Sequence, residues 1–292
     1  MNGVRKIKVI PPDKIDLPRS TIFEGDTLKV LNIIKSETIQ CAITSPPYWG
    51  LRDYEIEGQI GLEQSLPEYI NKLVTVFREV RRVLKDDGLF WLNIGDGYTS
   101  GNRKWRAPDK KNPARAMNVR PDTPVGLKPK DLLGVPWRLA LSLQEDGWFL
   151  RSDIIWNKPN AMPESVKDRP NRSHEYLFMF SKSEQYYYDY EASRETVIGG
   201  KRNKRSVWDI NTQPFSDAHF ATFPTTLIEP CVTISTKPGD FVLDPFFGSG
   251  TVGVVCQDLD RKYVGIELNP EYISIAYRRL HDHSNSLYRL AG

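Results

Sequence analysis

Apolar residues in this chain form two kinds of segment, which alternate from one end to the other. Short, nearly continuous apolar runs predict buried strands at residues 21–23, 38–44, 89–94, 148–156, 176–181, 241–243 and 262–266. Segments with apolar positions at helical spacing predict helices at residues 27–35, 67–85, 132–144, 227–231, 251–259 and 270–281. This alternation predicts an α/β fold with a mostly parallel sheet covered by helices on both faces.

The segments without a clear period are expected to be irregular: residues 96–129, 157–174 and 182–217, and the tail after His283. Two stretches are strongly basic. Residues 97–134 carry nine Lys or Arg against three Asp, and residues 199–205 have the sequence Gly-Gly-Lys-Arg-Asn-Lys-Arg. Each stretch is either a solvated loop or a phosphate-binding surface, and a neighbouring nucleic-acid site would favour the second interpretation.

Composition narrows the class of protein. The chain has 292 residues, 39% of them hydrophobic, which suffices for one large α/β domain with insertions or for two small domains. No apolar run approaches the roughly 18 residues of a membrane span, and the N-terminus lacks the apolar core of an export signal. The three cysteines are scattered and form no CxxC pair. We therefore expect no disulfide framework, no metal site, no membrane contact and a cytoplasmic location.

One glycine-rich turn follows a predicted strand and opens a predicted helix. Its residues are Asp244, Pro245, Phe246, Phe247, Gly248, Ser249, Gly250 and Thr251. The glycines allow a ligand to approach the backbone, and the helix N-terminus offers unpaired N–H groups. The turn begins with an acid, which would repel the phosphate of a dinucleotide but could receive an ammonium group. S-adenosylmethionine carries an ammonium group and no phosphate, so the turn predicts this cofactor and disfavours a nicotinamide-dependent oxidoreductase.

Two further acids stand at the ends of predicted strands. Glu267 ends the strand after the glycine turn, where an acid can bind the two ribose hydroxyls. Asp26 ends the first strand of the chain and could accept a hydrogen bond from the adenine amino group. The alternatives are a helix cap or a surface charge for Glu267 and a simple turn residue for Asp26.

A second motif, Ser45-Pro46-Pro47-Tyr48, also follows a buried strand. The prolines stiffen the loop and lack N–H groups, so their carbonyl groups can serve as acceptors. An exocyclic amino nitrogen of a base is conjugated with its ring, and acceptors on its hydrogens would free the lone pair for methylation. Ser45 and the Pro46 carbonyl could supply these acceptors, while Tyr48 could stack on a base rotated out of the duplex. The methyl group can then pass directly to nitrogen, without an enzyme nucleophile.

Together these motifs resemble the amino-methylating DNA methyltransferases, in the permuted subgroup where the catalytic motif precedes the cofactor motif. The resemblance implies a single catalytic domain over residues 20–292 with a Rossmann-like, seven-stranded, mostly parallel sheet whose last hairpin is reversed. It implies that Glu267 and Asp26 are neighbours in space, and that Phe220, Phe223 and Pro224 pack around the cofactor. The segments 156–159 and 173–176 resemble motifs beside the base pocket, although His174 could equally be a structural histidine.

The resemblance also bears on the substrate. In this family Ser before Pro-Pro usually accompanies cytosine N4 methylation and Asp accompanies adenine N6 methylation, so Ser45 favours cytosine N4. Adenine N6 is the main alternative, and a non-catalytic DNA-binding protein is a weaker one. The implied target-recognition region is about residues 182–218, aided by the basic insert at 97–134. The expected partners are double-stranded DNA and a cognate restriction endonuclease that need not bind physically. The chain is expected to be a prokaryotic or phage-encoded monomer or homodimer.

Overall fold

The computed structural model describes residues 4–6, 14–100, 121–213 and 223–291. Within these residues nine strands form one sheet in the order β1-β2-β11-β10-β3-β4-β6-β5-β9. Their bounds are β1 Val4–Lys6, β2 Thr21–Glu24, β3 Ile39–Thr44, β4 Leu84–Ile94, β5 Phe149–Asn157, β6 His174–Ser181, β9 Val207–Asp209, β10 Phe241–Asp244 and β11 Lys262–Glu267. β6 runs antiparallel to β4 and β5, and the other neighbouring pairs are parallel. The expected sheet with its reversed hairpin is confirmed, with β1 and β9 added at its edges.

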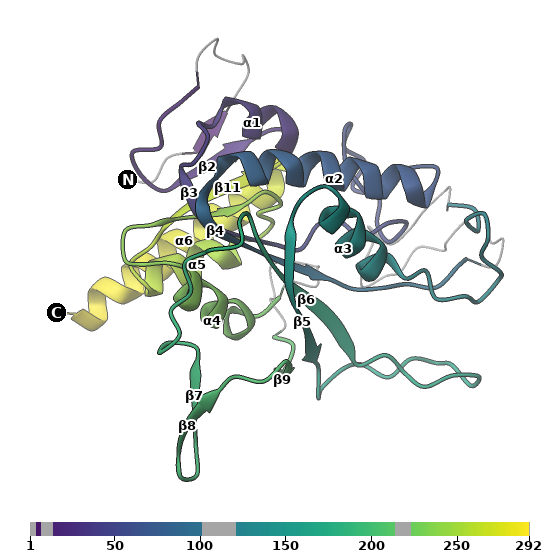
Figure 1. The fold of residues 1–292 in the computed structure, drawn as a ribbon. Coiled ribbons are helices and arrows are strands. Elements are labelled where there is room, and N and C mark those ends of the chain that lie inside the picture. The colour runs from purple at the N-terminus through teal and green to yellow at the C-terminus, as the bar shows by residue number, and fades with distance from the viewer. Residues whose placement is uncertain (1–3, 7–13, 101–120, 214–222, 292) are drawn as a thin grey trace.

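Helices cover both faces of the sheet (Figure 1). One apolar core packs under α1 (Thr27–Ile33), α2 (Leu66–Val83) and α3 (Val135–Glu145). The second packs under α4 (Thr225–Ser235), α5 (Thr251–Asp258) and α6 (Pro270–Ala291). Burial of the apolar faces of these helices against the sheet stabilises the sheet between the two helix layers. No helix in the described residues is both long enough and apolar enough to cross a membrane.

The strand order brings the two ends of the chain together. β10 and β11, from the C-terminal part, lie between β2 and β3, from the N-terminal part. Val242 pairs with Cys41, and Val264 pairs with Thr21, both in parallel register. Because parallel strands end at the same edge of a sheet, the two sequence motifs that follow β3 and β10 meet at that edge. This is the permuted arrangement expected from the order of the motifs.

β1 was not predicted, β4 begins at Leu84 instead of Leu89, and two longer segments also differ from the sequence-based expectation. Residues 182–217, predicted to be irregular, contain the hairpin of β7 (Arg194–Val197) and β8 (Gly200–Asn203), as well as β9. The hairpin was missed because its strands are short, with β8 exposed and β7 mostly half-buried, so they carry little apolar periodicity. The tail after His283, predicted to be loose, continues α6 to Ala291. A helix already begun on a packed face can extend through weak helix formers, because propagation costs far less than nucleation.

Candidate active site

A cavity of about 1210 Å³ lies at the edge where β3, β10 and β11 end. Its lining includes Ser45–Tyr48 from one predicted motif and Asp244–Ser249 and Thr251 from the other, together with Asp26, Phe223 and Glu267. Most small-molecule sites have volumes of about 300–1,000 Å³. The cavity therefore has room for more than one ligand group, and both motifs border the same space.

The glycine turn is built from backbone contacts and buried packing. Phe247 N donates to Ile266 O (2.9 Å), and Thr27 Oγ1 donates to Pro245 O (2.7 Å). Gly248 and Gly250 have positive φ angles of 50° and 80°, which favour glycine at both positions. Gly248 borders the cavity, whereas Gly250 packs against Ala276, where a Cβ would lie 3.1 Å from the Ala276 Cβ. Gly250 therefore does not line the cavity, and its lack of a side chain allows the turn to pack closely against α6.

Ser249 and Thr251 line the cavity with Pro245 and Phe246. Both hydroxyls accept hydrogen bonds from Arg279 Nη1, at 3.1 Å for Ser249 and 3.0 Å for Thr251. Arg279 comes from α6, so the long C-terminal helix holds the start of α5 in place.

Asp244 is 2% exposed at the end of β10. Its Oδ1 accepts hydrogen bonds from Thr44 Oγ1 (2.7 Å) and from Phe246 N (3.0 Å). Burial raises the pKa of this carboxyl from its usual 3.8 to about 7, although both hydrogen bonds act in the opposite direction. A cation beside Asp244 would favour the ionised form. Thr44 directly precedes the Ser45 loop, so this bond links the ends of the two motif-bearing strands.

Glu267 and Asp26 are neighbours, as expected. Glu267 pairs with Glu24 across β11 and β2, and its carbonyl oxygen accepts a hydrogen bond from Gly25 N (3.0 Å). The Glu267 carboxylate accepts from Gly248 N and Asn269 N, both at 2.8 Å, so it braces the glycine turn as well as bordering the cavity. Burial raises the pKa of Glu267. Asp26 caps α1 through a 2.9 Å bond from Lys29 N and also lines the cavity, so a local structural role and a binding role are compatible there.

The Ser45–Tyr48 loop is held by side chains from distant segments. Tyr69 of α2 donates to the Pro47 carbonyl oxygen (2.8 Å), so this carbonyl already has a partner. Tyr48 donates through its hydroxyl to Glu175 Oε2 (2.9 Å), and burial with the nearby Glu175 charge raises the pKa of this phenol. A Cβ at Gly95 would lie 2.9 Å from the Tyr48 ring, so glycine makes room for it.

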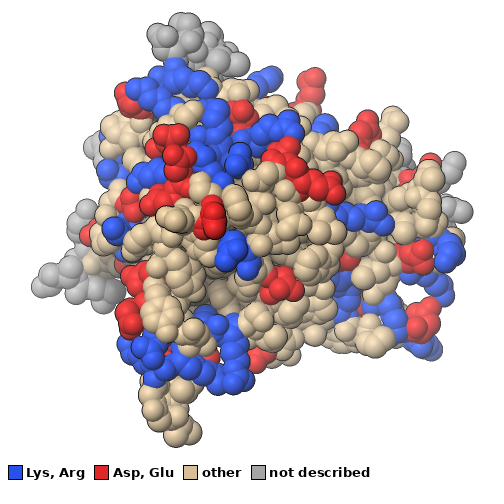
Figure 2. Space-filling view, in the orientation of Figure 1, with Lys and Arg blue, Asp and Glu red and all other residues tan. Residues whose placement is uncertain are grey.

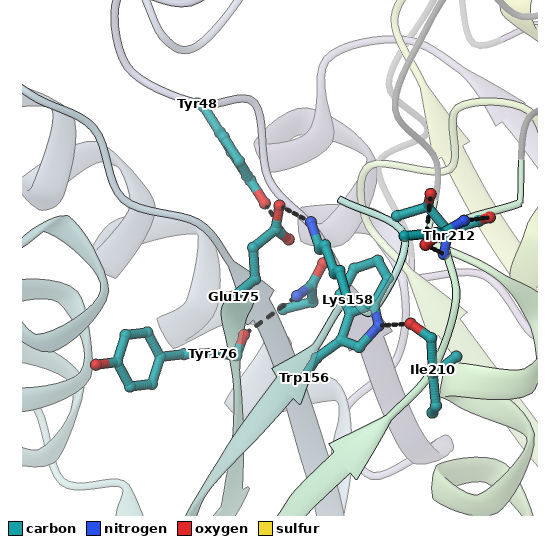
Figure 3. Close-up of polar contacts among 9 residues, drawn as sticks. Tyr48, Trp156, Lys158, Glu175, Tyr176, Ile210 and Thr212 are labelled. Atoms are coloured by element: carbon teal, nitrogen blue, oxygen red, sulfur yellow. Dashed lines mark hydrogen bonds and ion pairs between the residues drawn. The ribbon is translucent and has the colours of Figure 1, made fainter. Parts of the chain in front are cut away.

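Figure 3 shows the group around Tyr48. Glu175 points from β6 toward both Tyr48 and Lys158, and its Oε1 lies 2.5 Å from Lys158 Nζ. The Lys158 ammonium lies 4.1 Å from the centre of the Trp156 ring. The side chains of Lys158 and Glu175 are 17% and 18% exposed. All four residues line the cavity, so it contains a half-buried ion pair next to an aromatic platform.

The sequence interpretation missed several of these residues. Thr44 begins the catalytic motif but was given no role, and Tyr69 was interpreted only as an apolar position of a helix. Lys158 and Glu175 were noted in motifs without a role. Among the other predicted residues, Phe223 borders the cavity and Pro224 is buried at the start of α4, while Phe220 lies outside the described residues. His174 begins β6 and packs edge-on against Tyr176.

Basic side chains gather beside the β7–β8 hairpin. Lys201 and Arg202 are exposed on β8, and Figure 2 shows Lys and Arg at the lower left, where this hairpin projects. Arg202 also pairs with Glu195 (2.7 Å). Most of the basic residues of the 97–134 insert lie outside the described residues, so the predicted role of that insert stays a prediction.

The cysteines give no sign of nucleophilic chemistry. Cys41, Cys231 and Cys256 are buried, and burial raises the pKa of each thiol. Methyl transfer through carbon 5 of cytosine would require a reactive thiolate near the base. The cavity lining contains none of the three.

Comparison with known proteins identifies relatives of this chain. A family model described as DNA methylase, for N6 and N4 methyltransferases, matches residues 39–278. The chain is 66% identical to the Type II methyltransferase M.XycI of Xanthomonas campestris pv. cyanopsidis, over 99% of this chain and 96% of that protein. It is 68% identical to the Type II methyltransferase M.Cfr9I of Citrobacter freundii, over 96% and 93%.

Solved structures show the same fold. The PvuII DNA methyltransferase, described as cytosine-N4-specific, has a TM-score of 0.67 at 23% identity, over 94% of this chain and 95% of that one. A putative DNA modification methylase from Thermus thermophilus, described as a complex with S-adenosylmethionine, has a TM-score of 0.64 at 24% identity, over 90% and 93%. The chain therefore belongs to the DNA methylase family of N4 and N6 methyltransferases, whose methyl donor is S-adenosylmethionine.

Proposed function

We propose that this protein methylates the N4 amino group of a cytosine that has been rotated out of double-stranded DNA. The observation that carries the proposal is the shared cavity, which is bordered by the glycine turn on one side and by Ser45–Tyr48 on the other. Direct methyl transfer needs donor and acceptor side by side and little else from the enzyme. The shared cavity would supply that proximity.

The residues of the glycine turn suit S-adenosylmethionine. Asp244 is a buried carboxylate that a cation would stabilise, and the cofactor carries an ammonium group. Glu267 would accept from the ribose hydroxyls, because each carboxylate oxygen can take a second hydrogen bond. Asp26 would accept from the adenine amino group. When bound, the cofactor supplies an electrophilic methyl group.

The Ser45 loop would hold the base. Since the Pro47 carbonyl already accepts from Tyr69, Ser45 and the Pro46 carbonyl are the acceptors proposed for the two amino hydrogens. Their hydrogen bonds would draw the nitrogen lone pair out of conjugation and orient it. Tyr48 would stack on the base, with its ring plane fixed through Glu175. Phe223 and Pro224, with Phe220, would pack near the cofactor.

Cytosine is favoured over adenine by Ser45, the residue before the two prolines. The structural neighbour with a TM-score of 0.67, which shares the fold, is described as cytosine-N4-specific. Adenine N6 is the runner-up, because both bases present an amino group beside a ring nitrogen.

The remaining parts of the proposal concern the DNA-binding surface, the restriction–modification system and the cellular location. Residues 182–218, with the β7–β8 hairpin, are proposed to contact the target DNA, and exposed Lys201 and Arg202 would suit its phosphates. The names of the Type II relatives suggest a restriction–modification system with a cognate endonuclease. A prokaryotic cytoplasm is the location that fits this role.

Nucleoside analysis tests the base assignment. The purified protein is incubated with S-adenosylmethionine and unmethylated genomic DNA, which is then digested and analysed by mass spectrometry. N4-methylcytosine is the expected product. N6-methyladenine would overturn the assignment from Ser45 while keeping the cofactor site. No methylated base, with intact cofactor binding, would contradict the proposal that DNA is the substrate.

A further inference from the structure

A large apolar side chain stands exposed at the rim of the cavity. Met162 is 86% exposed, and it lies in the loop between β5 and β6. Among the described residues, it is the one exposed large hydrophobic side chain that also lines the cavity. Exposed apolar residues scattered singly need no explanation, but one placed at the mouth of a binding site suggests contact with the ligand.

The backbone on either side of Met162 is well anchored. Asn160 Nδ2 donates to Thr212 O (3.0 Å), and Thr212 N donates to Asn160 Oδ1 (2.8 Å). Ala161 N donates to Lys158 O (2.9 Å). Pro163 follows Met162 and restricts its backbone to extended conformations. The backbone at Met162 is therefore fixed, whereas the Met162 side chain makes little contact with the rest of the protein.

The surroundings of Met162 suit a DNA duplex. Figure 1 shows the β5–β6 loop extending away from the body of the protein as a narrow arm. Lys167 is exposed on this arm, where a phosphate could pair with it. Met162 itself lines the cavity, so a duplex that places a base in the cavity would pass close to this side chain.

A base that leaves the duplex leaves a gap in the stack, and an apolar side chain that enters the gap compensates for the lost stacking. Methionine is unbranched and adapts its shape to irregular spaces. We propose that Met162 enters the DNA beside the target base and fills the gap while the base occupies the cavity. This role rests on the proposed function, since it requires a rotated base, but it does not depend on which base is methylated.

Fluorescence of 2-aminopurine tests the proposal directly. The target site is first mapped by sequencing DNA methylated by the wild-type protein, and 2-aminopurine then replaces the target base in a short duplex. With S-adenosylhomocysteine present, wild-type protein is expected to raise the fluorescence as the base leaves the stack. Met162→Ala should lose most of this rise and reduce methyl transfer about tenfold, as expected for loss of one apolar side chain that becomes buried when it enters the DNA. Met162→Leu should restore most of both signals.

Val125→Ala is the matched control, because Val125 is 106% exposed but does not line the cavity. It should leave fluorescence and transfer unchanged, and cofactor affinity should be the same in all variants. A full fluorescence rise with Met162→Ala, or failure of Met162→Leu to exceed it, would overturn the proposal. Methyl groups are counted on either base, so production of N6-methyladenine would leave this test intact. A wild-type protein that transfers no methyl group to DNA would overturn both proposals.

Discussion

The two sides of the cavity are built in different ways. The cofactor side (residues 244–251 and Glu267) comes mainly from one strand–turn–helix–strand segment and is held largely within it by hydrogen bonds from backbone N–H groups. Side chains from elsewhere, such as Thr44 and Arg279, add to these bonds. The base side (residues 45–48, Trp156, Lys158 and Glu175) is assembled from distant segments through side chains. Tyr48 and Glu175, for example, are 127 residues apart in the chain.

This contrast shows which part of a site can be inferred from a short motif. On the cofactor side, glycines, an acid and a helix N-terminus determine the shape locally. On the base side, Ser-Pro-Pro-Tyr determines the loop, but its orientation depends on Tyr69 and Glu175. We therefore expect substitutions on the cofactor side to affect binding or folding, and substitutions on the base side to affect methyl transfer.

The strongest test of this division compares Asp244→Ala with Ser45→Ala. Asp244→Ala should weaken cofactor binding about 100-fold or more, because it removes the proposed partner of a desolvated ammonium group. Ser45→Ala should bind the cofactor normally and transfer the methyl group about 10- to 100-fold more slowly. Isothermal titration calorimetry and single-turnover transfer measure the two effects. Normal cofactor binding by Asp244→Ala would show that the glycine turn has been assigned wrongly.

Gly265→Ala probes the packing behind the glycine turn. A Cβ at this position of β11 would lie 2.4–2.6 Å from ring carbons of Phe247, which is buried and stacked on Tyr263. The free energy of unfolding should fall by about 3 kcal/mol, at the upper end of the cost of overpacking. Urea denaturation measures it. Gly97→Ala is the control, because its Cβ would meet Leu133 at an ordinary 3.5 Å, and an equal loss there would contradict the packing argument.

Glu175→Gln probes the base side. The substitution keeps the shape but leaves the Lys158 ammonium without its counter-ion and weakens the acceptor for Tyr48. Methyl transfer should slow about 10- to 100-fold, with unchanged cofactor affinity. Asp16→Asn is the control, since the Asp16–Lys35 pair is exposed on the surface. Weaker cofactor binding by Glu175→Gln would mean that the two sides are not separable.

The pH dependence should also separate the sides. Because Asp244 must be ionised to pair with the ammonium group, cofactor affinity should fall by up to about tenfold between about pH 7.5 and pH 6, and Asp244→Asn should abolish this dependence.

The folded protein without cofactor holds the Asp244 proton up to a pKa of about 7, whereas an unfolded Asp releases it near 3.8. Asp244 therefore lowers stability as the pH rises through this window, and Asp244→Asn should raise the Tm at pH 8. An unchanged Tm would argue against the raised pKa.

The sequence predicted seven of the nine strands of the sheet and the helices that cover it, because each has a strong apolar period or a clear glycine turn, whereas the three-residue edge strands β1 and β9 were not predicted. The resemblance to the permuted methyltransferases implied that Glu267 and Asp26 are neighbours, and the pairing of β11 with β2 confirms it. The β7–β8 hairpin was missed because its short strands lack an apolar pattern. The extension of α6 was missed because its last residues carry no apolar period and continue a helix that has already begun. The Tyr48–Glu175–Lys158 contacts join three separate segments, and only the folded chain reveals such contacts.

A crystal structure with S-adenosylhomocysteine would test the central claim, that one cavity brings the cofactor and the base together. We expect the amino group of the ligand beside Asp244, the ribose hydroxyls beside Glu267 and the sulfur facing the Ser45-Pro46 end of the cavity. A ligand bound elsewhere, or one whose sulfur faces away from Ser45, would contradict the account.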